Sequence, residues 1–237
     1  MALYFLSDVH LRLDHPERSR RLRAFADRLG DGDRLIIVGD LADFWYASRQ
    51  KHQPNSMCEG LQSLIRFLKR GGNLSLIPGN HDASLDAFYR ETLGVGFLPL
   101  AQDLVENGTR IHVTHGHTIG ARAFWKAWME SHAFLQAFRM LPRPVASSLD
   151  RLLNTANEIE RDKINLKHLA RFRHHADTLL ARADLVIFGH VHQVHDDSAS
   201  PRMIVLGGWH HRSSFLRVDE NGIELIVQDD LEHTSEK

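Results

Sequence analysis

Five short apolar runs in this sequence are each followed, within a few residues, by aspartate, asparagine or histidine. The clearest run covers residues 74–77 and leads into Pro-Gly-Asn-His-Asp at 78–82. The same arrangement follows four further runs, at residues 3–6, 35–38, 111–114 and 185–188. A short apolar run that ends at glycine or proline is typical of a buried strand. We therefore predict five strands that deliver polar side chains to one edge.

Helical patterns alternate with the first of these strands. Residues 16–29 carry apolar side chains at helical spacing and end before Gly30, and residues 61–68 repeat this pattern before a glycine pair. Ser84 is placed to cap a shorter helix that runs to Leu93. This alternation predicts an α/β fold with a mostly parallel sheet, in which ligands gather beyond the carboxyl ends of the strands.

The last part of the chain predicts further strands, at residues 203–206, 214–218 and 223–227. The sequence Asp-Glu-Asn-Gly at 219–222 separates the last two and is a strong hairpin signal. We expect these two strands to be antiparallel.

Length and composition favour one cytoplasmic domain spanning residues 1–237. With 237 residues and 43% hydrophobic content, the chain is able to bury a sizeable core. Its single cysteine, Cys58, excludes an intramolecular disulfide. The first residues do not resemble a signal peptide, and no apolar run approaches the roughly 20 residues that span a bilayer. We expect any membrane contact to be peripheral.

The segment 121–183 has a different character and is predicted to be a helical insertion. Between residues 121 and 174 there are ten Lys/Arg and five Asp/Glu, mixed with aromatic residues. One interpretation is an amphipathic hairpin packed on the core, and another is a cap that attracts an anionic, partly apolar ligand. Such mixing also occurs in binders of single-stranded nucleic acid. The net charge of −1 argues against that partner.

Seven residues at the predicted strand ends have side chains that bind transition metals: Asp8, His10, Asp40, Asn80, His115, His190 and His192. Imidazole favours Mn, Fe, Co, Ni or Zn over Mg or Ca, and the oxygen ligands suit Mn²⁺ and Fe²⁺. Seven ligands are too many for one tetrahedral zinc. Two ions about 3.5–4 Å apart that share a carboxylate can activate a water and bind a phosphoryl oxygen. We therefore expect attack of a metal-bridged hydroxide on phosphorus.

Each of these motifs also has an ordinary structural explanation. A His-x-His pair such as His190 and His192 places both side chains on one face of a strand by geometry alone. Asp40 suits a turn, and Asn80 suits a side-chain cap. Metal binding is favoured because five separate strand ends carry compatible residues together.

Five motifs resemble the calcineurin-like metallophosphoesterase pattern in order and spacing: Asp8-x-His10, Gly39-Asp40-x-x-Asp43, Gly79-Asn80-His81-Asp82, His115-Gly116-His117 and Gly189-His190-x-His192. The resemblance implies a four-layer αββα sandwich with a dinuclear site. It also implies that Asp40 bridges two metals. One metal would be held by Asp8, His10, Asp40 and His192, and the other by Asp40, Asn80, His115 and His190. His81 would contact phosphate and protonate or stabilise the leaving oxygen, and Asp82 would orient it.

A narrower resemblance reaches both ends of the chain. The motifs Leu-Ser-Asp-Val-His-Leu at 6–11, Asp-Phe-Trp at 43–45 and Val-Leu-Gly-Gly-Trp-His at 205–210 are similar to those of the UDP-2,3-diacylglucosamine pyrophosphohydrolases of lipid A synthesis, as is the insertion. This implies hydrolysis of a diphosphate bond in a lipid-linked sugar nucleotide at the cytoplasmic face of the inner membrane. We expect no nucleic-acid partner and no obligate protein partner. The expected cofactors are two divalent ions, Mn²⁺ first, with Fe²⁺, Co²⁺ or Zn²⁺ also compatible.

In that resemblance the segment 121–183 is a lid over the acyl chains. The residues expected to contact the substrate are Arg161, Lys163, Lys167 and His117.

Two positions depart from the narrower pattern. This chain has His81 where those enzymes typically carry arginine, and His117 where they carry aspartate. Arginine clamps a diphosphate with a permanent charge, whereas histidine donates a proton to a poorer leaving group. A general metallophosphatase or phosphodiesterase with a soluble substrate is therefore an alternative. A noncatalytic scaffold is a weaker one, because no predicted metal ligand is missing.

Overall fold

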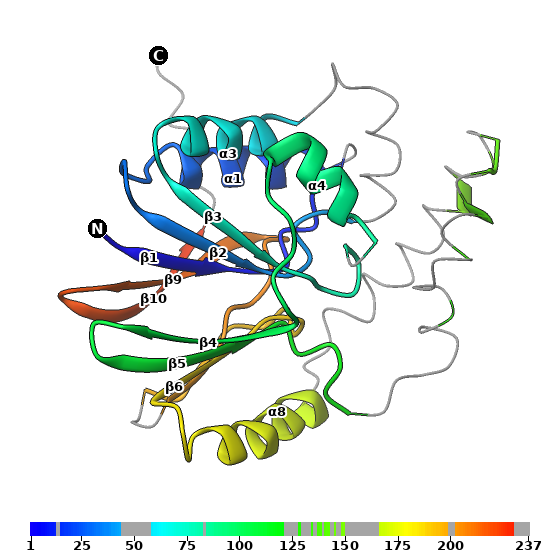
Figure 1. Cartoon of the computed structure of the whole chain (residues 1–237). Helices are drawn as coiled ribbons and strands as arrows, with labels where there is room; N and C mark the ends of the chain where they lie inside the picture. Colours follow the sequence, from blue (N-terminus) through cyan, green and yellow to red (C-terminus); the bar gives the residue numbers. More distant parts are fainter. Residues whose placement is uncertain are drawn as a thin grey trace.

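Two five-stranded sheets form the centre of the protein in the computed structural model (Figure 1). The structure describes residues 1–12, 15–43, 58–82, 84–120, 166–198 and 202–229, together with single residues between 128 and 149. The first sheet has the order β10-β9-β1-β2-β3 and contains β1 (Leu3–Leu6), β2 (Arg34–Val38), β3 (Asn73–Ile77), β9 (Arg212–Asp219) and β10 (Gly222–Asp229). The second has the order β4-β5-β6-β8-β7 and contains β4 (Ala101–Glu106), β5 (Thr109–Thr114), β6 (Leu185–Phe188), β7 (His195–Asp196) and β8 (Arg202–Val205).

Each sheet has a parallel core and antiparallel outer strands. Strands β1, β2 and β3 run parallel, as do β5, β6 and β8. Antiparallel pairs add β9 and β10 to the first sheet and β4 and β7 to the second. The expectation of one mostly parallel sheet is corrected to two mixed sheets, because hairpins supply the outer strands.

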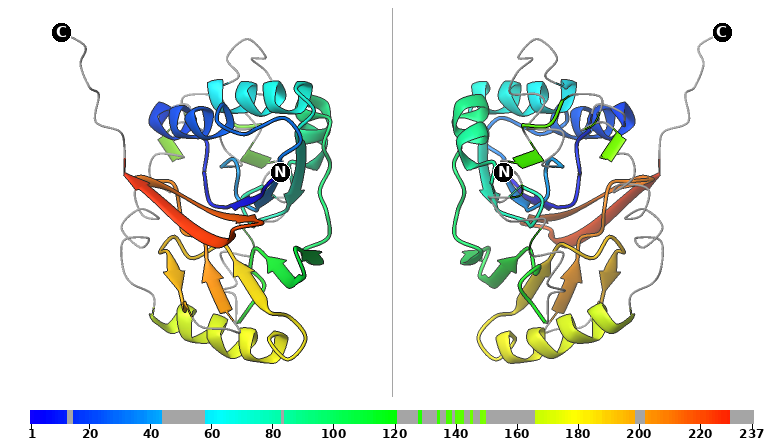
Figure 2. Two further views of the ribbon diagram at one scale, coloured as in Figure 1. Left: turned by 90° about the vertical axis from the view of Figure 1, so that its left-hand side faces the viewer. Right: turned by 90° about the vertical axis from the view of Figure 1, so that its right-hand side faces the viewer.

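Helices cover the two outer faces of this pair of sheets (Figure 2). Helices α1 (Pro16–Ala26), α3 (Glu59–Lys69) and α4 (Asp86–Leu93) lie on the side of the first sheet. Helix α8 (Leu166–Leu179) packs against the second sheet, where Phe172 and Ala176 join Phe188 and Val205 in one buried cluster. The order of layers is therefore helix, sheet, sheet, helix, and the four-layer sandwich is confirmed.

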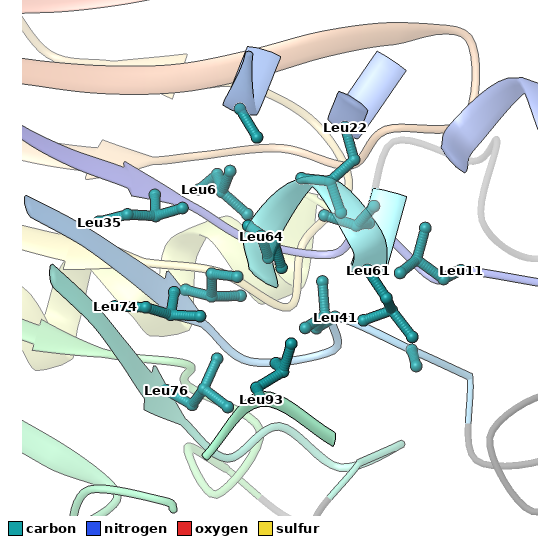
Figure 3. Close-up of a cluster of buried hydrophobic side chains, with 14 of the residues drawn as sticks. Leu6, Leu11, Leu22, Leu35, Leu41, Leu61, Leu64, Leu74, Leu76 and Leu93 are labelled. Carbon is teal, nitrogen blue, oxygen red and sulfur yellow. The ribbon is translucent and has the colours of Figure 1, made fainter. Parts of the chain in front are cut away.

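Alternation along the strands explains how the layers are held together. Leu35 and Ile37 belong to the cluster beneath α1 and α3, which Figure 3 shows with the leucines of both helices. The intervening Ile36 and Val38 belong to the cluster between the sheets. Successive strand residues point to opposite faces, so a strand that is buried on both faces must be apolar throughout. The continuous apolar runs in the sequence follow from this requirement.

The three helices predicted before residue 94 are confirmed with shifted bounds, except at one cap. Helix α4 begins at Asp86 with Leu85 in the N-cap position, and no side chain caps it. The prediction that Ser84 caps this helix is wrong, because the Leu85 amide donates to the carbonyl oxygen of Asp82 at 2.8 Å and forms a turn before the helix.

Helix α8 lies near the end of the segment 121–183, most of which falls outside the described residues. The insertion and its role as a lid stay predictions. No described helix is both long enough and apolar enough to cross a membrane.

Gly39 follows β2 at a point where a side chain has no room. Its φ is +81°, and a Cβ there would lie 2.4 Å from Nδ1 of His115 and 2.8 Å from Cα of Gly79. We expect Gly39→Ala to lower the free energy of unfolding by roughly 2–5 kcal/mol, since the left-handed backbone and the overlap both cost energy. Urea unfolding of the variant measures this loss.

Gly94→Ala is the matched control for this substitution. Gly94 also has a positive φ, +71°, but a Cβ added there would have no heavy atom within 4 Å beyond its chain neighbours. We expect this control to lose only about 1–2 kcal/mol, the cost of the backbone conformation. Equal losses at the two positions would show that crowding at Gly39 does not matter.

Candidate active site

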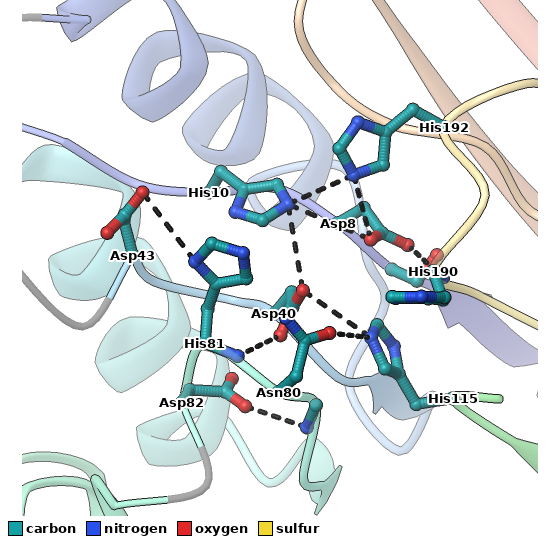
Figure 4. A network of polar contacts seen from close by, with 12 residues as sticks. Asp8, His10, Asp40, Asp43, Asn80, His81, Asp82, His115, His190 and His192 are labelled. Carbon is teal, nitrogen blue, oxygen red and sulfur yellow. Dashed lines mark hydrogen bonds and ion pairs between the residues drawn. The ribbon is translucent and has the colours of Figure 1, made fainter. Parts of the chain in front are cut away.

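The seven predicted ligands come together at one rim of the sandwich, beyond the ends of five strands (Figure 4). Asp8, His10, Asp40 and His115 are each 0–1% exposed. Three groups of side chains have ligand atoms within 4.8 Å of one another: Asp8, His10 and His192; Asp8, Asp40 and His115; and His10, Asp40 and His81. The first sheet supplies Asp8, Asp40 and Asn80, whereas the histidines 115, 190 and 192 follow strands of the second.

Four of these residues have left-handed backbone conformations. Their φ angles are 53° at Asp8, 48° at His10, 55° at Asp40 and 65° at His190. Such angles cost a non-glycine residue about 1–3 kcal/mol and persist only where neighbours enforce them. The amides of Asp8 and His10 donate to the carbonyl oxygens of Gly39 and Asp40 at 3.1 and 3.0 Å. The loops after β1 and β2 therefore hold each other in the turned conformation that aims both carboxylates at the rim.

The carboxylate of Asp8 faces two imidazoles. Its Oδ2 accepts a hydrogen bond from the amide of His190 at 2.9 Å. Its Oδ1 is buried without a hydrogen-bond partner among the described residues, 3.3 Å from Nε2 of His192 and 3.7 Å from Nε2 of His10. The two Nε2 atoms are themselves 3.3 Å apart. A buried carboxylate oxygen beside two converging ring nitrogens fits a divalent cation.

Asp40 lies between the group formed by Asp8, His10 and His192 and a second group formed by Asn80 and His115. Its Oδ1 accepts from the amide of His81 at 2.9 Å, while its Oδ2 lies 3.7 Å from Nε2 of His10 and 3.4 Å from Nε2 of His115. Oδ1 of Asn80 is 3.3 Å from the same His115 nitrogen. A carboxylate in this position is suited to bridge two cations.

The tautomer of His115 suits metal binding in the group that contains Asn80. Its Nδ1 lies 2.8 Å from the carbonyl oxygen of Val38, which only accepts, so Nδ1 is the donor. In the neutral ring Nε2 then carries the lone pair and faces Asp40 and Asn80. A backbone carbonyl that fixes the far nitrogen is a common support for a metal-binding histidine.

The buried charges shift several pKa values. Burial alone would raise the pKa of Asp40, but His115 and His81 lower it well below its ordinary value. Burial lowers the pKa of His115, but the Asp40 charge outweighs this and brings it to about 9. Burial, with the His115 charge, lowers the pKa of His190 to about 3. The carboxylates thus require nearby positive charge, which a protonated imidazole or a bound cation supplies.

The two catalytic candidates, His81 and Asp82, have different neighbours. Nδ1 of His81 lies 3.8 Å from Oδ2 of Asp43, and Nη1 of Arg12 lies 3.4 Å from the same oxygen. The Asp82 carboxylate instead accepts from the amides of Gly79 and Leu41, at 2.8 and 2.9 Å. These bonds tie the loops after β2 and β3 together, while Asp43 stands beside the His81 ring. The orienting role expected of Asp82 stays a prediction.

Asp82 is buried beneath the site. Burial, together with the charge of Asp40, raises its pKa to about 7. The hydroxyl of Tyr89 on α4 donates to its Oδ2 at 3.4 Å. This carboxyl group thus connects the base of the site to the helical layer.

The predicted substrate contacts are only partly described. The ring of His117 lies 5.3 Å from that of His115, which places it at the edge of the second group. Arg161 and Lys163 lie outside the described residues, as does the side chain of Lys167, so their roles stay predictions. The sequence reasoning missed His168 on α8, whose ring is 6.3 Å from that of His190. Its helical position gave no signal, since only the packing of α8 brings it there.

Comparisons with known proteins find similarity along almost the whole chain. UDP-2,3-diacylglucosamine hydrolases of Salmonella arizonae and Salmonella typhi are each 27% identical over 246 residues, which covers 96% of this chain and 99% of theirs. Among solved structures, an archaeal phosphodiesterase is 15% identical with a TM-score of 0.46, over 96% of this chain and 99% of that one. Vps29 of Chaetomium thermophilum is 15% identical with a TM-score of 0.43, over 97% of each chain.

The model of the family described as "Calcineurin-like phosphoesterase" matches residues 1–194 of this chain. That range includes all seven residues of the rim, together with His81 and Asp43. The chain therefore belongs to the calcineurin-like phosphoesterase family and is a metal-dependent phosphoesterase.

Proposed function

We propose that this protein hydrolyses the phosphoanhydride bond of a lipid-linked sugar nucleotide, with UDP-2,3-diacylglucosamine as the first candidate. The observation that carries this proposal is the extent of the match to the UDP-2,3-diacylglucosamine hydrolases, 96% of this chain and 99% of the relative. A match of that extent includes the basic and aromatic segment 121–183 as well as the strands that carry the site. Such a segment suits a substrate that is both anionic and apolar.

The donor set supports two divalent ions at the rim. Asp8, His10, Asp40 and His192 would hold one, and Asp40, Asn80, His115 and His190 would hold the other. A mixture of imidazole, carboxylate and amide without thiolate suits Mn²⁺ best, and Fe²⁺, Co²⁺ and Zn²⁺ are compatible. Two such ions would supply Lewis acidity toward phosphoryl oxygens and an activated water as nucleophile.

His81 is the side chain best placed to act on the leaving oxygen. Its ring lies between Asp43 and the ring of His10, whose centroid is 4.8 Å away (Figure 4). Asp43 would fix the orientation of the ring and stabilise its protonated form, as a carboxylate does for a general acid. The ring would then donate a proton to the departing oxygen or stabilise its charge.

The second candidate function is hydrolysis of a soluble phosphodiester or phosphomonoester. His81 favours it, because an alkoxide leaves poorly without a proton whereas a phosphate group leaves readily. The two functions differ in their need for acyl chains and in their dependence on His81. Both share the same metal centre.

Metal titration tests the centre itself. After treatment with a chelator, we expect the protein to bind two Mn²⁺ per chain in equilibrium dialysis with metal analysis. Asp40→Asn should weaken both sites, because Asp40 faces both groups of ligands. Asp177→Asn, at an exposed position on α8, is the control and should bind as the native chain does. Full binding by Asp40→Asn would contradict the bridging assignment.

A substitution at His81 tests the acid. His81→Ala should lower kcat by roughly 10²-fold or more on a substrate with a poor leaving group. The number of metals bound should not change, since the ring supplies no predicted ligand. His174→Ala, an exposed histidine on α8, should leave kcat unchanged. If the His81 variant kept full turnover, the acid role would be refuted.

A substrate series separates the two functions. With Mn²⁺ present, we expect kcat/KM to be highest for UDP-2,3-diacylglucosamine, lower for UDP-sugars without acyl chains and lowest for an aryl phosphodiester. Burial of the acyl chains supplies the difference in binding free energy. Equal values for acylated and unacylated UDP-sugars would instead support the soluble substrate.

A further inference from the structure

A loop after β8 places another histidine against the Asp8 side of the site. The ring of His210 is stacked on that of His192, with centroids 4.7 Å apart and an interplanar angle of 29°. It also meets the ring of His10 at 5.4 Å and 64°. These are the two imidazoles whose Nε2 atoms converge beside Oδ1 of Asp8.

Backbone hydrogen bonds attach this loop to both ligand-bearing loops. The amide of Trp209 donates to the carbonyl oxygen of Asp8 at 3.1 Å, and the amide of Gly208 donates to that of His192 at 3.0 Å. The position of His210 is therefore set by the same contacts that set the two ligands.

The same loop is also bonded to α1 and to β9. Arg21 on α1 donates to the carbonyl oxygens of Trp209 and His210 at 2.8 and 2.9 Å. The Trp209 side chain is fully buried, and its indole nitrogen donates to the carbonyl oxygen of Ser214 at 2.9 Å. These bonds fix the backbone at residues 209 and 210 from two layers of the fold.

Gly208 gives the stacked rings their spacing. A Cβ at this position would lie 3.1 Å from Cβ of His192 and 3.2 Å from Nδ1 of His210. Both distances are shorter than an ordinary van der Waals contact between such atoms. The glycine thus lets the loop approach closely enough for the rings to stack.

We infer that His210 is a positioning residue for the cation site formed by Asp8, His10 and His192. Its ring fixes the orientation in which the two Nε2 atoms face the Asp8 carboxylate. The histidines of the other cation site have different supports. His115 is held by the carbonyl oxygen of Val38, and its ring lies 5.3 Å from that of His190. The effect of His210 should therefore concentrate on one of two cations. The inference rests on the proposed dinuclear centre.

Co²⁺ titration tests it with a readout that does not depend on turnover. Chelator-treated protein is titrated with Co²⁺ while its visible absorption and the heat of binding are recorded. We expect the native chain to bind two Co²⁺. His210→Ala should retain one site and lose roughly 10- to 100-fold in affinity at the other, the usual scale for a residue that orients a metal ligand.

Two further variants make the result specific. His210→Phe keeps a flat ring and should restore most of the affinity, whereas His211→Ala, the exposed neighbour, should behave as the native chain does. Unchanged affinity and absorption in His210→Ala would overturn the inference, as would equal losses in the Ala and Phe variants. If the native chain bound fewer than two Co²⁺, the dinuclear centre would be wrong instead. Unfolding midpoints establish that each variant is folded.

Discussion

The burial of two neighbouring carboxylates is the constraint around which this structure is built. Asp8 and Asp40 are 0% and 1% exposed, and two like charges removed from water repel each other strongly. Each has one oxygen fixed by a backbone amide, from His190 and His81 respectively. The other oxygen of each faces imidazole nitrogens. This arrangement leaves a concentrated negative charge that a divalent cation neutralises better than hydrogen bonds alone.

The two sheets both contribute to this arrangement, so the site depends on the packing between them. Asp8 and Asp40 follow strands of the first sheet, whereas His115 and His190 follow strands of the second. The apolar cluster between the sheets fixes their separation, because its side chains from both faces pack against each other. A shift of one sheet would move the imidazoles away from the carboxylates. The hydrophobic effect thus sets the distances on which the polar chemistry relies.

The central strands, and the meeting of the residues at their ends, could be predicted from the sequence because parallel strands buried on both faces produce continuous apolar runs. Strand β4 was missed for the opposite reason. It is an edge strand with alternating exposure, and its run Ala-Gln-Asp-Leu-Val-Glu has few apolar residues. Its hairpin turn, Asn107-Gly108, was the signal that could have found it.

The hydrogen-bond and ion-pair partners of the side chains that follow each strand could not be predicted from the sequence. Asp82 adjoins His81 in the sequence, but its oxygens turn to the amides of Gly79 and Leu41. Asp43, almost forty residues away, stands beside the ring. Sequence order determines which residues reach the rim, whereas the turned backbone after each strand decides where they point. His210 follows the same rule, since only the fold brings its loop to β1 and the His192 loop.

The asymmetry of the centre bears on substrate choice. The Asp8 side is lined by the rings of His10, His192 and His210, and His81 packs against His10 on this side. The His115 side is bordered by His117, and His190 there lies near His168 at the start of α8. An acid is useful only where the departing oxygen needs a proton, so under the proposed role of His81 a leaving alkoxide would lie near its ring. A phosphate leaving group gains more from positive charge. In the proposed function, a leaving phosphate would therefore depend less on His81 than a leaving alkoxide would.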